Sequence, residues 1–246
     1  MDKKLILFIP GLWGSGHVHD GSSWCFEPWQ EVISHMGYKS LVLNTRREDT
    51  LSHTAEHTIT EYILNVKNRI QSLGDPTKIV LVGHSMGGLI AQKIAELYSL
   101  GGVVLVSSAP PRGINALHWE LMSRIWRYMP DMLMNEPFIP NKQDATDLLF
   151  SRCENPDKLY EKLVPENGYL ALKLATISVQ VSDKLRCPSL VVGGKHDRLL
   201  PLSIQLKIAK KYGSNYANMD CGHVPMLEKN NEKFITEIMW WIERFK

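Results

Sequence analysis

The chain of 246 residues is poor in cysteine, and its cysteines show no spacing that predicts a metal site or a disulfide framework. Cys25, Cys153, Cys187 and Cys221 lie far apart and form no Cys-x-x-Cys pair. Short cysteine spacings are typical of zinc sites, and dense cysteines are typical of small secreted domains. We therefore expect reduced thiols, no metal or other cofactor, and a cytoplasmic location.

The sequence also lacks a long apolar run and an excess of charge of one sign. No stretch approaches the ~20 apolar residues that span a bilayer, and the short apolar run near the amino terminus fits a buried strand better than a signal peptide. The 28 basic residues are balanced by 26 acidic ones, which argues against a nucleic-acid partner. Since 44% of the residues are apolar, we expect a globular enzyme or small-molecule binder, with the oligomeric state left open.

Short apolar runs alternate with helical patterns along most of the chain, which is typical of a parallel sheet covered by helices. The predicted strands are Leu5–Pro10, Ser40–Leu43, Lys78–Val82, Gly102–Val106, Ser189–Val192 and, from a weaker pattern, Asn215–Met219. The predicted helices are Trp29–Met36, Thr54–Leu73, Gly87–Tyr98, Ser203–Tyr212 and Glu232–Phe245. This pattern predicts an α/β fold.

The segment from Pro110 to Asp183 breaks this alternation. It contains no clear strand and is rich in Trp, Tyr, Phe and Met, and a structureless loop of that length is implausible in a compact domain. The sequence therefore predicts a helical cap at residues 110–183, inserted after the fourth strand into a core of residues 1–109 and 184–246. Most apolar residues of the cap should pack within it, while some should line a substrate pocket. The predicted pocket residues are Trp13, Trp119, Trp126, Met129 and Val224.

A serine between glycines is the strongest chemical motif in the sequence. Gly83-His84-Ser85-Met86-Gly87-Gly88 follows a predicted strand and precedes a predicted helix. A sharp turn at such a junction exposes the serine hydroxyl at the sheet edge, beside a helix amino terminus. We therefore predict that Ser85 is a catalytic nucleophile.

A serine hydroxyl is a poor nucleophile unless an oriented base removes its proton. His223 lies on the loop after the last predicted strand, and Asp197 lies on the loop after the strand before it. Both loops are at the carboxyl edge of the sheet, as is Ser85, and the chain order serine, acid, histidine fits this arrangement. We predict His223 as the general base and Asp197 as the acid that orients its ring.

Other ionisable residues fit these roles less well. The side chain of His84 is expected to point away along the turn, and His196 is expected to shape the acid loop. Asp220 ends a strand without an obvious route to His223. The His-Val-His-Asp cluster at residues 17–20 has no matching partner elsewhere, so it predicts a solvated loop rather than a metal site.

Acyl chemistry also needs hydrogen-bond donors for the developing oxyanion. The loop at residues 10–16 is rich enough in glycine to turn its backbone N–H groups inward. The expected donors are the N–H groups of Met86, next to the nucleophile, and of Leu12, with Trp13 as the alternative to Leu12.

The motifs GHSMGG, GGKHDRLLP and CGHVPMLEK, in this order, resemble the α/β-hydrolase superfamily, and most of all its small capped serine esterases and lipases. The resemblance covers nearly the whole chain and implies Ser85 as nucleophile, Asp197 as acid and His223 as base. One departure is Pro10-Gly11, where the superfamily usually has His-Gly before the oxyanion loop. Because the chain starts at the strand leading into that loop, we expect about six strands, essentially all parallel.

The expected reaction is attack of Ser85 on a lipophilic carboxylic ester of small to medium size, followed by release of the acyl-enzyme by water activated through His223. The serine argues against the dehalogenases and epoxide hydrolases of the superfamily, whose nucleophile is an aspartate. A cap rich in methionine and aromatic residues favours an apolar substrate. A triad alone does not choose the bond, so thioesterase, lactonase, perhydrolase, acyl-transfer and carbon–carbon hydrolase reactions stay open, as does a non-catalytic binding protein.

Overall fold

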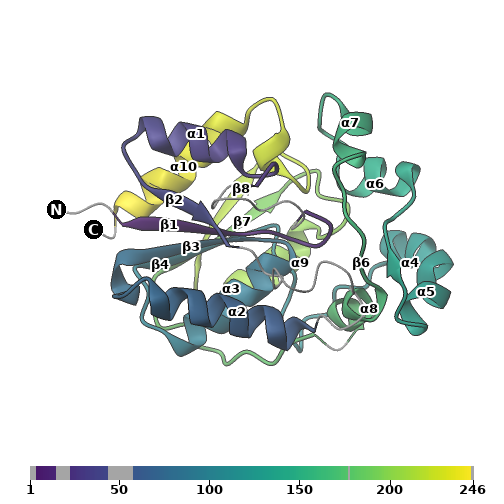
Figure 1. The fold of residues 1–246 in the computed structure, drawn as a ribbon, viewed down its shortest axis with the longest axis horizontal. Helices are drawn as coiled ribbons and strands as arrows, with labels where there is room; N and C mark the ends of the chain where they lie inside the picture. Colours follow the sequence, from purple (N-terminus) through teal and green to yellow (C-terminus); the bar gives the residue numbers. More distant parts are fainter. Residues whose placement is uncertain (1–3, 15–22, 44–57, 177, 245–246) are drawn as a thin grey trace.

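The computed structural model describes residues 4–14, 23–43, 58–176 and 178–244, and a parallel sheet of six strands runs through its centre (Figure 1). The strands are β1 (Leu5–Ile9), β2 (Ser40–Val42), β3 (Ile79–His84), β4 (Gly102–Val106), β7 (Ser189–Gly194) and β8 (Asn215–Met219). They lie in the order β2-β1-β3-β4-β7-β8, and each neighbouring pair is parallel. The predicted six-stranded parallel sheet is confirmed, and its carboxyl ends all lie at one edge.

Both faces of the sheet are buried because its side chains alternate between two apolar clusters. In β1, Ile6 and Phe8 belong to one cluster, whereas Leu7 and Ile9 belong to the other. The first face is covered by α1 (Glu27–His35) and α10 (Asn231–Glu243), and the second by α2 (Ile59–Ser72), α3 (Met86–Leu97) and α9 (Leu202–Tyr212) (Figure 1). Because both of their faces are buried, the central strands consist of consecutive apolar residues.

The ends of the helices and strands depend on local hydrogen bonds and on glycine positions, which the pattern of apolar residues does not reveal. α2 begins at Ile59 because Thr58 caps it: the Thr58 hydroxyl accepts a hydrogen bond from the Glu61 N–H (3.3 Å), and the Glu61 carboxylate accepts one from the Thr58 N–H (2.6 Å). The predicted start at Thr54 lies outside the described residues. β3 and β7 each run two residues beyond their predicted ends, into glycine-containing sequence.

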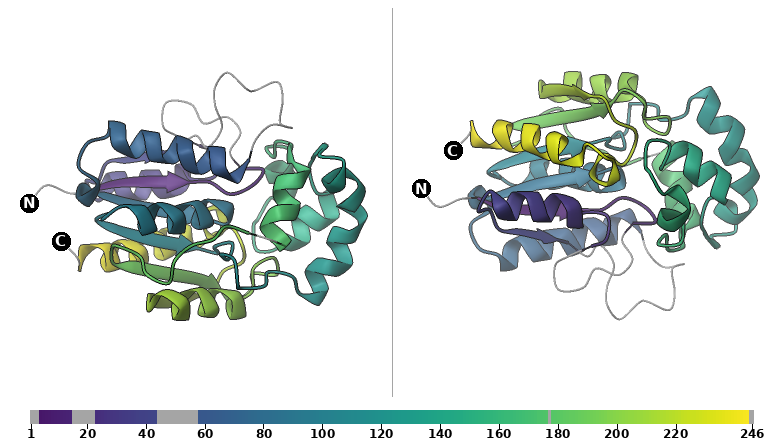
Figure 2. Two further views of the ribbon diagram at one scale, coloured as in Figure 1. Left: turned by 90° about the horizontal axis from the view of Figure 1, so that it is seen from below. Right: turned by 90° about the horizontal axis from the view of Figure 1, so that it is seen from above.

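Between β4 and β7 the chain leaves the sheet and forms a layer of short helices, which both views of Figure 2 place beyond the carboxyl edge. The elements are α4 (Trp119–Ile125), the 3-10 turn η4 (Trp126–Tyr128), α5 (Met129–Leu133), α6 (Lys142–Leu148), α7 (Pro156–Tyr160) and α8 (Gly168–Thr176). An antiparallel pair, β5 (Pro137–Phe138) with β6 (Glu166–Asn167), joins two parts of this layer and is a feature that the sequence did not predict. The layer therefore faces the strand ends that carry Ser85 and Asp197.

Candidate active site

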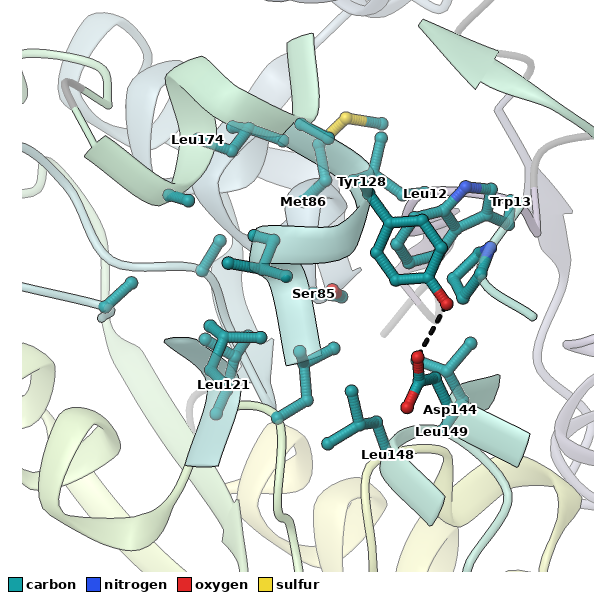
Figure 3. A pocket seen from close by; sticks show the side chains of 18 of the residues that line it. Leu12, Trp13, Ser85, Met86, Leu121, Tyr128, Asp144, Leu148, Leu149 and Leu174 are labelled. Atoms are coloured by element: carbon teal, nitrogen blue, oxygen red, sulfur yellow. Dashed lines mark hydrogen bonds between the residues drawn. The ribbon is translucent and has the colours of Figure 1, made fainter. Parts of the chain in front are cut away.

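Ser85 lies at the sharp turn between β3 and α3. Its backbone has φ 54° and ψ −120°, a conformation that residues other than glycine rarely adopt. Hydrogen bonds hold the turn in place: the Ser85 N–H donates to the Val106 carbonyl (3.1 Å), and the Ser85 carbonyl accepts from the N–H groups of Gly88 (3.0 Å) and Ala109 (2.9 Å). The turn presents Ser85 to a cavity between the sheet and the helical layer (Figure 3).

Glycine is required on both sides of this serine because backbone segments approach closely. A Cβ atom at Gly83 would lie 2.4 Å from the Gly87 carbonyl oxygen, and a Cβ atom at Gly87 would lie 2.1 Å from the Ile9 carbonyl oxygen. Both distances are far below van der Waals contact. The two glycines thus allow the start of α3 to pack directly on β1 and β3, which fixes the position of Ser85.

Gly87→Ala is expected to lower the free energy of unfolding by about 3 kcal/mol, since α3 has to move away from the Ile9 carbonyl. Gly102→Ala is the matched control, because its added Cβ would come no closer than 3.6 Å to any neighbour. Urea unfolding of both variants measures the difference. Equal losses in the two variants would show that close packing at Gly87 does not hold the turn.

Asp197 and His223 form a buried pair on the loops after β7 and β8. His223 Nδ1 lies 3.0 Å from Asp197 Oδ2, and the two side chains are 2% and 0% exposed. The other carboxylate oxygen, Oδ1, accepts hydrogen bonds from the N–H groups of Leu199 (3.0 Å) and Leu200 (2.8 Å). These bonds fix the carboxylate on its own loop, so Asp197 can hold the ring of His223 in one orientation. The competing carboxylate, Asp220, is exposed and pairs with His196 Nε2 at 2.7 Å.

The loop that carries His223 is anchored by two residues that sequence reasoning did not assign to the site. Glu228 is buried, and its carboxylate accepts a hydrogen bond from the Gly222 N–H (2.6 Å). The His84 ring donates from Nε2 to the His223 carbonyl (2.8 Å), and the two ring centroids are 4.8 Å apart. The prediction that the His84 side chain points away from the site is therefore wrong, because the turn before Ser85 directs it toward the β8 loop.

His84 should make stability depend on pH. Burial, with a smaller contribution from the His223 ring, lowers the pKa of His84 from 6.5 to about 3. As the pH falls below 6.5, the unfolded chain binds a proton here and the folded chain does not, so the free energy of unfolding decreases by up to about 1.4 kcal/mol per pH unit. When the free energy of unfolding in urea is measured between pH 7 and pH 4, the His84→Gln variant should lack this decrease. Parallel stability curves for parent and variant would contradict it.

Ser85 and His223 line a shared cavity, together with Gly11, Leu12 and Trp13 of the loop after β1. Among the described residues no hydrogen bond joins the Ser85 hydroxyl to the His223 ring, so proton transfer requires the hydroxyl to turn toward Nε2 or a bridging water. Met86 is the first residue of α3, where a backbone N–H has no partner within the helix. Leu12 and Met86 both line the wall beside Ser85, as does Trp13, whose φ is 61°.

Two cavities meet at Ser85. The larger, of about 110 Å³, extends under the helical layer and has an almost entirely apolar wall (Figure 3). The smaller, of about 30 Å³, lies on the side of His223 and includes Val224. Both are lined by Leu12, Trp13, Ser85 and Leu149. The predicted pocket residues Trp13 and Val224 thus lie at the cavities.

Three other predicted pocket residues are corrected by the structure. Trp119 and Trp126 are 86% and 75% exposed, so the prediction that they line the pocket is wrong. Met129 is half-buried, packs against an apolar cluster and is not in the cavity wall. The residues of this stretch that line the cavity are Leu121, Ile125, Tyr128 and Met132. They are spaced four, three and four residues apart, as residues on one face of a helix are. Helical spacing, rather than side-chain size, would therefore have predicted them.

The described part of the chain holds no group of three or more His, Cys, Asp or Glu side chains arranged to bind a metal. The cluster at residues 17–20 lies outside the described residues. Cys25, Cys153, Cys187 and Cys221 are free thiols. None of the helices in the described ranges has both the length and the apolar character needed to cross a bilayer.

Comparison with curated proteins finds relatives of low sequence identity. Salicylic acid-binding protein 2 from Nicotiana tabacum is 25% identical over 166 residues, which cover 65% of this chain and 63% of that protein. Probable esterase PIR7A from Oryza sativa subsp. indica is 24% identical over 181 residues, covering 70% and 65%. The chain therefore spans less than two thirds of the length of these curated relatives.

The fold is shared with solved structures at low sequence identity. An esterase from Exiguobacterium antarcticum superposes with a TM-score of 0.73 at 17% identity, covering 98% of this chain and 92% of the esterase. The sequence model of the alpha/beta hydrolase family matches residues 6–237. With the six-stranded parallel sheet and the serine turn after β3, this match shows that the chain belongs to the alpha/beta hydrolase family.

Proposed function

We propose that the protein is a serine hydrolase that cleaves carboxylic esters through an acyl-enzyme on Ser85. The observation that carries this proposal is the buried Asp197–His223 pair, whose histidine lines the same cavity as a serine held in a strained strand-to-helix turn. A nucleophile, a base and an orienting acid are the groups that acyl transfer requires. The similarity to a rice protein named a probable esterase supports the same reaction class.

In the proposed mechanism, Ser85 Oγ attacks the ester carbonyl carbon while its proton passes to His223 Nε2. The Asp197 carboxylate stabilises the resulting imidazolium through the hydrogen bond at Nδ1. The backbone N–H groups of Met86 and Leu12 stabilise the oxyanion. His223 then returns the proton to the departing alkoxide, and a water deprotonated by the same ring hydrolyses the acyl-enzyme.

The two cavities support an orientation for the substrate. The leaving oxygen must receive its proton from His223, so the alcohol portion belongs in the smaller cavity on that side, whose volume is about 30 Å³. The acyl portion then occupies the larger cavity, whose apolar wall suits a lipophilic group. We propose, on this basis, esters of small to medium size in which a short alcohol is joined to an apolar acid.

Residues 110–183 act in this proposal as a lid over a core formed by residues 1–109 and 184–246. Two contacts tie α4 to the acid loop: His118 Nε2 lies 3.2 Å from the Leu199 carbonyl, and Glu120 forms an ion pair with Arg198. The Trp13 indole donates to the Phe138 carbonyl (3.1 Å), which connects the oxyanion loop to β5. The lid therefore contacts the loops that carry the proposed catalytic groups.

A substrate panel tests the reaction class. The full chain is assayed with esters in which either the acyl chain or the alcohol is lengthened, and with matched thioesters and lactones. Esters of an apolar acid and a short alcohol are expected to give the highest kcat/KM, and lengthening the alcohol should lower it more than lengthening the acid. Faster cleavage of the thioester or lactone series would favour an alternative reaction on the same residues.

A further inference from the structure

Among the described residues that line the larger cavity, Tyr128 and Asp144 bring hydrogen-bond acceptors to a wall that is otherwise apolar around Ser85. The Tyr128 hydroxyl donates to Asp144 Oδ2 (2.6 Å) and accepts from the Asn141 N–H (2.8 Å). Figure 3 shows this pair on one side of the cavity, across from Leu121 and Leu174. A single polar pair in an apolar pocket is the arrangement that orients a ligand rather than merely accommodating it.

The polar pair is held rigidly by the cap. The Asp144 side chain is 3% exposed, and its Oδ1 accepts from Arg124 Nη1 at 2.9 Å. Arg124 also binds Asp147 (2.8 Å), and Arg127 Nη1 lies 3.4 Å from Asp144 Oδ2. Arg124 also lies 4.0 Å from Glu120, which pairs with Arg198, so three guanidinium groups balance three carboxylates. Burial, together with the bond to Asp144, raises the pKa of Tyr128 to about 12, so its phenol keeps its proton.

The pair retains unused capacity to accept hydrogen bonds. A carboxylate offers about four lone-pair positions and a phenol oxygen two. Among the described residues, Asp144 accepts one hydrogen bond at each oxygen, and the Tyr128 oxygen accepts one. A ligand group that reaches this spot must therefore donate. Because the local charges are already balanced, a neutral donor such as a hydroxyl fits better than a cation, and an anion would meet only lone pairs.

We propose that Tyr128 and Asp144 form a specificity subsite that accepts a hydrogen bond from a hydroxyl group on the acyl portion of an otherwise apolar ester. This inference rests on the proposed function for the orientation of the substrate. Ser85 lines the same cavity, so only a hydroxyl at a particular distance from the ester carbonyl can reach the pair. The subsite takes no part in bond breaking and selects among acids by the position of that hydroxyl.

The test compares methyl esters of n-alkanoic acids with those of the corresponding ω-hydroxy acids over a range of chain lengths, since the short alcohol suits the smaller cavity. In the parent, the ratio of kcat/KM for the hydroxylated to the plain ester should reach a maximum at one length. In both Tyr128→Phe and Asp144→Asn this maximum should fall about tenfold, the loss expected for one hydrogen bond. Tyr169→Phe, at an exposed tyrosine of α8, is the matched control and should keep it. A flat ratio in the parent, or a maximum that survives in both variants, would overturn the subsite.

Binding separates this inference from the proposed reaction. The same ester pairs are titrated by calorimetry into the Ser85→Ala chain, which cannot form the acyl-enzyme. A preference for one hydroxylated ester that disappears in the Ser85→Ala/Tyr128→Phe chain supports the subsite even where the parent hydrolyses neither ester. That result would reject the proposed function alone. Equal affinities for both members of every pair would reject the subsite alone.

Discussion

Ser85→Ala is expected to lower kcat/KM for a short-alcohol ester by on the order of 10⁴- to 10⁶-fold, the range known for loss of a triad nucleophile. Without Oγ no acyl-enzyme forms, and only binding and oxyanion stabilisation remain. The comparison is made by initial rates on the parent and the variant, with unfolding midpoints measured for both. The strained backbone at Ser85, with φ 54°, makes the midpoint measurement necessary.

Ser107 provides a matched control for this substitution. It lies directly after β4, the strand next to β3, and its φ is also positive, at 43°, but it is not in the wall of either cavity that meets at Ser85. Ser107→Ala should retain most of the parent activity. A Ser85→Ala chain that folds and hydrolyses the ester as fast as the parent would contradict the proposed nucleophile.

Asp197→Asn is expected to lower kcat by about 10⁴-fold, as the equivalent change does in a serine protease triad. The amide can still accept from the N–H groups of Leu199 and Leu200. Its NH₂ group, however, would face His223 Nδ1 and favour the ring tautomer that carries its proton on Nε2. That tautomer cannot take a proton from Ser85. Pre-steady-state release of the alcohol from a short-alcohol ester measures the acylation step directly.

Asp220→Asn tests whether Asp220, rather than Asp197, is the carboxylate that orients His223. Asp220 is exposed and pairs with His196 and Arg152, so its replacement should leave kcat close to that of the parent. The reverse result, with Asp220→Asn nearly inactive and Asp197→Asn active, would assign the orienting role to Asp220 instead.

The sheet was predictable because its central strands are buried on both faces and therefore consist of consecutive apolar residues, whereas the edge strand β8 is partly exposed and gives a weaker pattern. Residues such as Leu5–Ile9 and Gly102–Val106 carry that signal locally. The ends of the strands were harder to predict. β3 and β7 extend through Gly83 and Gly194, where another backbone segment packs too closely for a side chain. A Cβ at Gly194 would lie 2.5 Å from the Gly222 carbonyl oxygen. Such contacts join loops distant in sequence and leave no periodic pattern.

The grouping of Ser85, Asp197 and His223 was predictable from topology. Parallel strands place their carboxyl ends at one edge, so loops after three different strands were expected to meet there, and the structure brings their side chains to one site. The role of His84 in holding the His223 loop was not predictable, because the direction of its side chain depends on the strained turn at Ser85.

The chain between β4 and β7 forms short helices, as its composition led us to expect, but the choice of pocket residues there followed side-chain size instead of helical phase. Trp119 and Trp126 are the bulkiest apolar residues of their helices and lie on the outer side, while Leu121 and Ile125 face the cavity. Size suggests burial, but the helical phase determines which side chains turn inward. The hydrogen bond between Tyr128 and Asp144 joins residues 16 apart and has no signal in the sequence.

The most direct measurement of the central claim is covalent labelling with a fluorophosphonate ester, followed by peptide mapping by mass spectrometry. The proposal predicts one adduct per chain, located on Ser85, with labelling slowed greatly in His223→Ala and absent in Ser85→Ala. A parent chain that forms no adduct, or forms it on another residue, would contradict the assignment of Ser85 as the nucleophile of an ester hydrolase.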